Sequence, residues 1–138
     1  MEEQKAGFKE VEHTADLELE VWGETVSALF HQAARGMRHL LDVQVDSSAR
    51  ATRQFNVKAI DYEGLLVDFL SELLYLLERD GLVFQNLALD LTQGTQLEVE
   101  FQGVHVESYS REIKAVTYHN LEVKQTEEGW TANVVFDI

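Results

Sequence analysis

The stretch that most constrains the fold is "YEGLLVDFLSELLYLLERD", residues 62–80, because its apolar side chains recur every three or four positions. Asp61 stands directly before it, where an N-cap residue belongs, and Gly81 follows it, where helices commonly stop. The pattern predicts one long helix that forms the spine of the core. Its predicted core positions are Leu65, Leu66, Phe69, Leu70, Leu73, Leu74 and Leu77.

A second helix is predicted over residues 24–42, "ETVSALFHQAARGMRHLLD", where apolar side chains again follow helical spacing. Gly36 is an interior weakness in this pattern, because glycine disfavours a helix by about 1 kcal/mol relative to alanine. The cluster "DSSA" at 46–49 is predicted to be a loop. The predicted core positions of this helix are Leu29, Phe30, Ala33, Met37, Leu40 and Leu41.

The remaining chain predicts strands. In "DLELEVW", residues 16–22, and in the terminal "GWTANVVFDI", residues 129–138, apolar and polar side chains alternate as in a strand with one buried face. Further strands are expected at 8–13, 52–60, 82–91, 96–107 and 113–123, with "QTEEGW" as the turn before the last strand. Strands in runs, with two helices in the first half, predict a single α+β domain over 1–138 with about six to seven mostly antiparallel strands.

Composition excludes several classes of protein. The 138 residues include 25 acids against 11 Lys and Arg, a formal charge of −14 that argues against a broad phosphate-binding face. The absence of Cys excludes a disulfide framework and a cysteine-ligated zinc site. No stretch approaches the roughly 18 apolar residues of a membrane span, and the acidic start "MEEQKAGFKE" lacks a signal-peptide pattern, so we expect a cytoplasmic protein.

Three segments could carry chemistry: "EHTAD" at 12–16, "KAVTYH" at 114–119 and the terminal "FDI". Each has a structural alternative. Asp16 could serve a tight turn, and Asp137 could lie on a solvated strand face. His13 and His119 could be ordinary hydrogen-bonded histidines. Glu72, four residues after an acid on the long helix, could belong to a solvated face but is kept as a functional candidate.

If the first and last of these segments met, repulsion between their carboxylates would favour the binding of a metal ion. Asp16, Asp137 and the terminal carboxylate of Ile138 would then crowd like charges, and each charge would penalise ionisation of the others. A hard divalent cation such as calcium or magnesium would remove that penalty, because it takes carboxylate oxygens and waters as ligands. Zinc would favour nitrogen, which His13 could supply.

Read together, "HTADLELEVWG", "LLVDFLSELLYLLERDGLVF" and "KAVTYHNLEVKQTEEGWTANVVFDI" resemble the archease family, in order and over nearly the whole chain. The resemblance implies a small acidic cytoplasmic accessory protein of the RNA ligase that joins 3′-phosphate or 2′,3′-cyclic phosphate ends to 5′-hydroxyl ends in tRNA splicing and RNA repair. Such a protein speeds guanylylation of the ligase's active-site histidine by GTP and contacts RNA only through the ligase. It is not itself an enzyme.

The resemblance also implies a ligand set. The family's metal-binding positions correspond to Asp16, Asp137 and the main-chain carboxylate of Ile138, with calcium as the expected metal and magnesium, manganese or zinc as alternatives. Lys114 falls at an important position of "KAVTYH", and the same motifs contain His13 and His119. One departure is Asn120, which stands where the family pattern has glycine after "TYH".

Two other functions are compatible with the sequence. One is a chaperone-like binder of RNA-modifying enzymes such as a tRNA methyltransferase, a role also proposed for archeases. The other is a metal-dependent phosphohydrolase that uses Asp16 and Asp137, although the sequence contains no recognisable nucleophile motif. The sequence leaves the oligomeric state and the RNA substrate open.

Overall fold

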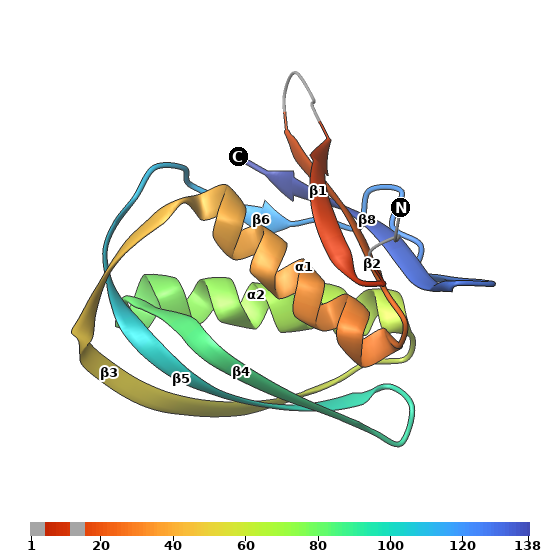
Figure 1. Ribbon diagram of the computed structural model, residues 1–138, viewed down its shortest axis with the longest axis horizontal. Helices are drawn as coiled ribbons and strands as arrows, with labels where there is room; N and C mark the ends of the chain where they lie inside the picture. The colour runs from red at the N-terminus through yellow and green to blue at the C-terminus, as the bar shows by residue number, and fades with distance from the viewer. Residues whose placement is uncertain (1–4, 12–15) are drawn as a thin grey trace.

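The computed structural model describes residues 5–11 and 16–138, and the chain forms two sheets with two helices between them (Figure 1). The elements in chain order are β1 (Gly7–Val11), β2 (Leu17–Gly23), α1 (Val26–Leu41), β3 (Val43–Lys58), α2 (Tyr62–Asp80), β4 (Leu82–Thr92), β5 (Gln96–Tyr109), β6 (Ala115–Val116), β7 (Lys124–Thr126) and β8 (Gly129–Asp137). The predicted α+β class is confirmed. Neither helix combines the length and apolar character needed to cross a membrane, within the residues described.

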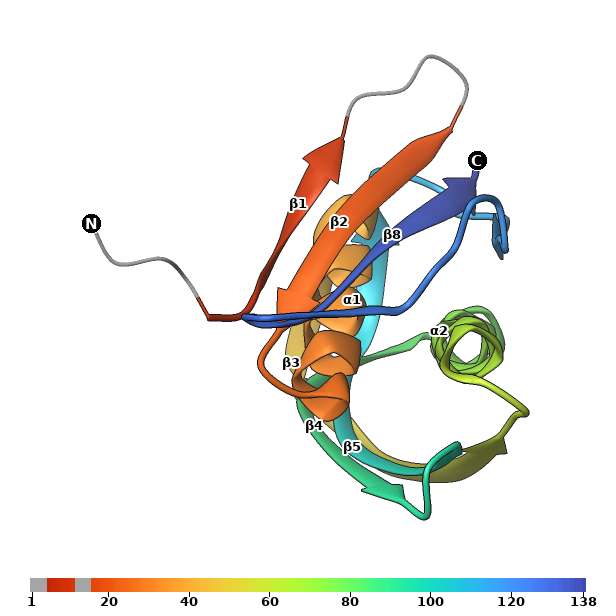
Figure 2. The ribbon, with the colours of Figure 1, turned by 90° about the vertical axis from the view of Figure 1, so that its right-hand side faces the viewer.

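Both sheets are antiparallel throughout. The first has the order β1-β2-β8-β6, with β7 also paired to β8, and the second has the order β3-β5-β4. The second sheet curves beneath α2, while α1 packs mainly on β1 and β2 (Figure 2). Side chains from both sheets and both helices form one continuous apolar core.

The long helix α2 is the predicted spine. The carboxylate of Asp61 accepts a hydrogen bond from the amide of Gly64 at 2.7 Å, which confirms the N-cap. At the other end of the helix, the amide of Gly81 donates a hydrogen bond to the carbonyl of Leu77. The fully buried ring of Phe69 lies 5.9 Å from Phe30 of α1, centroid to centroid. The helix therefore joins its own apolar face to that of α1.

Gly36 has a packing role that the sequence pattern did not predict. A Cβ atom at this position would lie 2.7 Å from Cδ1 of Leu19 and 3.1 Å from the ring of Phe8. These distances are shorter than ordinary van der Waals contact. Glycine thus lets α1 approach β1 and β2 closely, which offsets its weak helix propensity.

The predicted loop at residues 46–49 is wrong, because these residues lie within β3, which runs from Val43 to Lys58. The register against β5 shifts between Asp46 and Arg50. There the carboxylate of Asp46 accepts hydrogen bonds from the amide and the hydroxyl of Ser48, at 3.0 and 2.6 Å. The polar cluster therefore makes a local irregularity inside a strand rather than a connection between elements.

The predicted strand at 113–123 is also mostly wrong. Within this range only Ala115–Val116 pairs, as β6. Residues 5–11 and 16–138 form eight strands, against an expectation of about six to seven. After β6 the chain turns, with the amide of Leu121 donating to the carbonyl of Tyr118 at 3.0 Å. Asn120 adopts a left-handed conformation, with φ at 52°, which a continuous strand cannot include.

Candidate functional site

The central strand β8 brings distant parts of the chain together at one end of the five-stranded sheet. Leu17 of β2 pairs with Phe136 of β8, and Asp137 pairs with Ala115 of β6. Because β2 and β8 are antiparallel, Asp16 before Leu17 and Asp137 after Phe136 lie at the same end of the ladder. Figure 2 shows the beginning of β2 and the end of β8 at that common end.

Asp16 and Asp137 also lie on the same face. Leu17 and Phe136 face the core, so the residues next to them, Asp16 and Asp137, belong to the opposite face of the pleat. On that face the amide side chain of Asn133 donates to the carboxylate of Glu18 at 2.7 Å, which shows that it presents polar groups. Asp16 is partly buried and Asp137 is exposed. The fold therefore places these two acidic residues at the same end of the ladder and on the same face of the sheet.

Lys114, directly before β6, lies at the same end of the sheet. Its backbone amide donates a hydrogen bond to the carbonyl oxygen of Asp137 at 2.8 Å, and its side chain is exposed. Ile138 follows Asp137, and 42% of its surface is exposed. We call Asp16, Asp137 and the main-chain carboxylate of Ile138 the acidic tip, and Lys114 is the cation beside it.

The segment after β6 is held against β8 by Thr117. Its hydroxyl donates to the carbonyl of Val135 at 2.9 Å and accepts from the amide of His119 at 3.2 Å. The side-chain amide of Asn120 contacts Nε2 of the His119 ring at 3.3 Å. The left-handed backbone of Asn120 explains the departure from glycine, because Asn adopts this conformation more readily than most residues.

The same segment is tied to the beginning of α2. A carboxylate oxygen of Glu63 accepts a hydrogen bond from the amide of Val123 at 2.6 Å. Partial burial raises the pKa of the neighbouring Tyr118, and the negative charges of Asp68 and Asp61 raise it further. Glu63 and Thr117 are thus positioning residues that the sequence reasoning missed. No local pattern identifies Glu63, since its partner lies 60 positions away in the chain.

The structure brings together Asp16, Asp137, Ile138 and Lys114, with His119 in the adjoining segment. Glu72 lies elsewhere, in a groove between α2 and β3 that Phe55 and Tyr75 also line. His13 lies outside the described residues.

The donor set of the acidic tip suits a hard cation. Two side-chain carboxylates and one main-chain carboxylate supply only oxygen, which calcium and magnesium prefer. Over 5–11 and 16–138, no group of three or more His, Asp or Glu side chains lies close enough together to hold a metal ion. The tip would therefore leave coordination positions to water or to oxygen atoms of a bound partner.

Solved structures share this fold. The solution structure of protein 1598 from Methanobacterium thermoautotrophicum is 23% identical, with a TM-score of 0.69, and the match covers 96% of this chain and 99% of the other. A crystal structure from Thermotoga maritima, described as an archease and possible chaperone, is 22% identical, with a TM-score of 0.71, and the match covers 94% and 96%.

Sequence comparison gives the family. The chain is 35% identical to the protein archease of Methanosarcina barkeri and 37% identical to that of Methanosarcina mazei, over 100% of each chain. The family model described as "Archease protein family (MTH1598/TM1083)" matches residues 8–138. That match includes Asp16, Lys114, Asp137 and Ile138. The chain therefore belongs to the archease family.

Proposed function

We propose that this archease is an accessory protein of the RNA ligase that joins 3′-phosphate to 5′-hydroxyl ends, and that it promotes GTP-dependent guanylylation of that ligase. The observation that carries the proposal is the convergence of Asp16, Asp137 and Lys114, which lie directly before β2, at the end of β8 and directly before β6. The apolar residues of the same strands pack the core, and none of these three charged residues belongs to it. Charged groups gathered at one end of a sheet favour a functional site.

In this proposal Asp16, Asp137 and the main-chain carboxylate of Ile138 hold a divalent cation, calcium in the first place, with magnesium, manganese or zinc as alternatives. The cation relieves repulsion among the three carboxylates. When bound, it supplies electrostatic stabilisation to phosphate oxygens. Lys114, exposed beside the tip, contacts a phosphate of GTP or an acid of the ligase.

The contact with RNA runs through the ligase. With a net charge of −14, the chain as a whole repels polyanions, and phosphate contacts from Lys and Arg supply most of the affinity for nucleic acid. The acidic tip therefore suits a basic, nucleotide-binding pocket on a protein better than a duplex or a single strand.

The test is the initial rate of guanylylation of the cognate ligase with GTP, measured with a catalytic amount of this protein. The wild-type chain should accelerate the reaction, and Asp137→Asn should abolish the acceleration, because it removes one charge of the tip while preserving size. Asp90→Asn is the matched control, since Asp90 is an exposed acid on β4 of the other sheet. Full stimulation by Asp137→Asn would refute the role of the tip, and no stimulation by the wild type would refute the accessory role.

A chaperone-like role is the second candidate, because the related structure from Thermotoga maritima is described as a possible chaperone. It predicts that the protein suppresses aggregation of an RNA-modifying enzyme such as a tRNA methyltransferase, and that Asp137→Asn does so equally well. Phosphate release from GTP by the purified protein alone, measured in the same series, would instead support the phosphohydrolase.

A further inference from the structure

Helix α1 has a charge distribution opposite to that of the chain. The protein has 25 acids in 138 residues, yet none of the 16 residues of α1 is acidic. Its His31, Arg35, Arg38 and His39 have the spacing i, i+4, i+7 and i+8, which places them along one face of the helix. We call these four side chains the cationic stripe.

The cationic stripe lines an open groove of about 480 Å³ between the outer strands of the two sheets, β1 and β4. Helix α1 contacts both edge strands, β1 and β4 (Figure 1). Phe8 of β1 and Phe84 and Leu87 of β4 contribute apolar walls, and Asp42 lies at the end of the helix. The groove belongs to neither the acidic tip nor the segment after β6, because it shares no residue with them.

The two arginines of the stripe differ from others in the protein. Arg53, Arg79 and Arg111 each form an ion pair with a carboxylate. Arg35 and Arg38 have no such partner within 5–11 and 16–138; their guanidinium groups lie over the rings of Phe8 and Phe84, at 5.9 and 5.7 Å from the centroids.

Structural roles account for only part of the stripe. Arg38 donates to the carbonyl of Phe84 and His31 contacts the carbonyl of Leu87 at 3.2 Å, so both cover the edge of β4. Arg38 and His39 also lie in the last turn of α1, where positive charge interacts favourably with the helix dipole. Arg35 lies in the middle of the helix and is exposed. In the part of the chain that the structure describes, its polar and ring contacts are the neutral side chain of Gln32, at 3.2 Å, and the ring of Phe8.

We propose that this groove binds a small phosphorylated ligand of the nucleoside polyphosphate class, with its phosphates on Arg35, Arg38 and His39 and its apolar part against Phe8 and Leu87. A guanidinium presents five N–H donors, and within residues 5–11 and 16–138 Arg35 and Arg38 each use one of them in a hydrogen bond. The groove volume falls within the roughly 300–1,000 Å³ of small-molecule sites. This inference does not depend on the proposed function.

The charges of the groove favour a compact anion over a polymer. Two arginine charges, with two imidazole rings as further hydrogen-bonding groups, match the few phosphates of a polyphosphate, whereas a nucleic acid needs many phosphate contacts and is repelled by the net charge of −14. Asp42 repels an anion that extends past the end of α1. Partial burial lowers the pKa of Arg38, because a guanidinium that is partly removed from water is less well stabilised in its charged form.

The test is a titration of the full chain, followed by amide chemical shifts in NMR with EDTA present so that the acidic tip holds no metal. ATP and inorganic pyrophosphate should both bind saturably and shift amides of α1 and β1, whereas adenosine should bind weakly or not at all. Arg35→Gln should raise the Kd for ATP about tenfold, as for loss of a charge-assisted hydrogen bond, and Arg35→Lys should raise it less. The matched control is Arg50→Gln, which removes an exposed arginine of β3 that contacts the carbonyl of Ser47.

Three results would overturn the proposal. They are equal binding of adenosine and ATP, equal loss of affinity in Arg35→Gln and Arg50→Gln, and tighter saturable binding of a polyglutamate peptide than of ATP, which would identify an acidic protein segment as the occupant. Because Arg35 and Arg50 are exposed, both variants should keep the wild-type Tm. Stimulation of ligase guanylylation by the Arg35→Gln variant, measured separately, distinguishes the role of this groove from that of the acidic tip.

Discussion

The backbone amide of Lys114 donates a hydrogen bond to the carbonyl oxygen of Asp137 at 2.8 Å, so the position of Lys114 beside the acidic tip depends on its main chain and not on its side chain. Ala115 pairs directly with Asp137, which continues the same ladder. The side chain of Lys114 is exposed and is therefore available for a partner.

Replacing Lys114 should separate function from stability. Lys114→Ala keeps the backbone hydrogen bond, so the free energy of unfolding should stay within about 0.5 kcal/mol of wild type, as for an ordinary surface substitution. Stimulation of ligase guanylylation should fall about tenfold if Lys114 contributes one charge-assisted contact. Lys124→Ala, at an exposed position of β7, is the control and should stimulate normally. Normal stimulation by Lys114→Ala would contradict its proposed contact.

Removing the carboxylate of Glu63 should loosen the segment after β6. Glu63→Ala leaves the amide of Val123 without its 2.6 Å hydrogen bond, and bonds to charged groups contribute roughly 1.5–3 kcal/mol. Hydrogen exchange of the Val123 amide should accelerate by one to two orders of magnitude, about what that energy corresponds to. Glu78→Ala, an exposed acid on the same helix, should leave this amide unchanged. Equal exchange in both variants would show that the bond does not hold the segment.

Two glycines with positive φ should respond differently to alanine. Gly94 has φ at 77° and nothing within 4 Å of an added Cβ, so Gly94→Ala should cost only backbone strain, about 1–2 kcal/mol. Gly129 has φ at 140°, and an added Cβ would lie 2.4 Å from the carbonyl oxygen of Gly23. Gly129→Ala should therefore lower the free energy of unfolding, measured with urea, by about 3 kcal/mol or more. Equal losses would mean that close approach to Gly23 contributes nothing.

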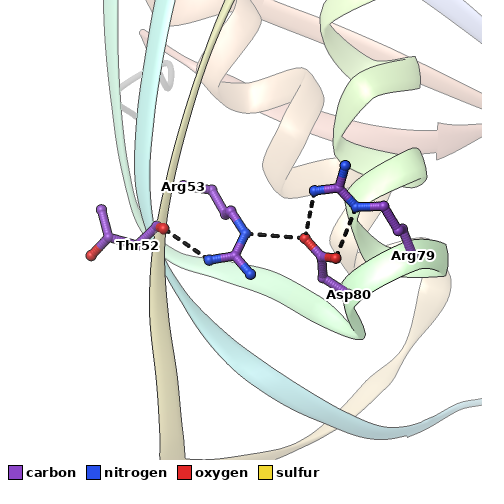
Figure 3. Close-up of polar contacts among 4 residues, drawn as sticks. All are labelled: Thr52, Arg53, Arg79 and Asp80. Atoms are coloured by element: carbon purple, nitrogen blue, oxygen red, sulfur yellow. Dashed lines mark hydrogen bonds and ion pairs between the residues drawn. The ribbon is translucent and has the colours of Figure 1, made fainter.

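The stability contributed by Asp80 should depend on pH. Arg79 and Arg53 donate hydrogen bonds to its carboxylate, at 2.8 and 3.0 Å, which holds the pKa of Asp80 well below its ordinary value (Figure 3). A depressed pKa in the folded state stabilises the protein above the unfolded pKa of about 3.9 and loses this effect as the pH falls further. Asp80→Asn should therefore be less stable than wild type at pH 7, with a gap that narrows below about pH 4.

Urea unfolding between pH 7 and pH 3 measures this gap directly. Asp90→Asn is the control, since it changes the net charge by the same amount. Asp90 is exposed and has no arginine partner within 5–11 and 16–138. A gap for Asp80→Asn that is as large at pH 3 as at pH 7 would contradict the ion-pair explanation.

The elements whose signals are local were predictable from the sequence. The helix over 62–80 follows from an apolar stripe between an N-cap and a stop, all within 21 residues, and the structure has α2 at Tyr62–Asp80. The alternation after Asp16 and before Ile138 likewise predicted two strands with one buried face. These predictions are confirmed because hydrophobic periodicity and capping act between residues close in the chain.

Alternation of apolar and polar residues did not distinguish a strand from a segment whose hydrogen bonds go to partners outside a strand ladder. The pattern of residues 113–123 predicted one strand. In the structure the hydroxyl of Thr117 donates a hydrogen bond to the carbonyl of Val135, and the carboxylate of Glu63 accepts one from the amide of Val123. In contrast, the polar residues 46–49 read as a loop but remain in β3, because β5 pairs on both sides of them. Partners far along the chain decided both cases.

The sequence by itself determined the family motifs, the two helices, the buried faces of β2 and β8 and the acidic character of the chain. Only the tertiary structure placed Asp16 and Asp137 at one end of one ladder, put Lys114 beside them and set the cationic stripe of α1 between two sheet edges. The physical reason is that strand register is set by hydrogen bonds and core packing between distant segments, and a shift of one residue would turn each side chain to the other face.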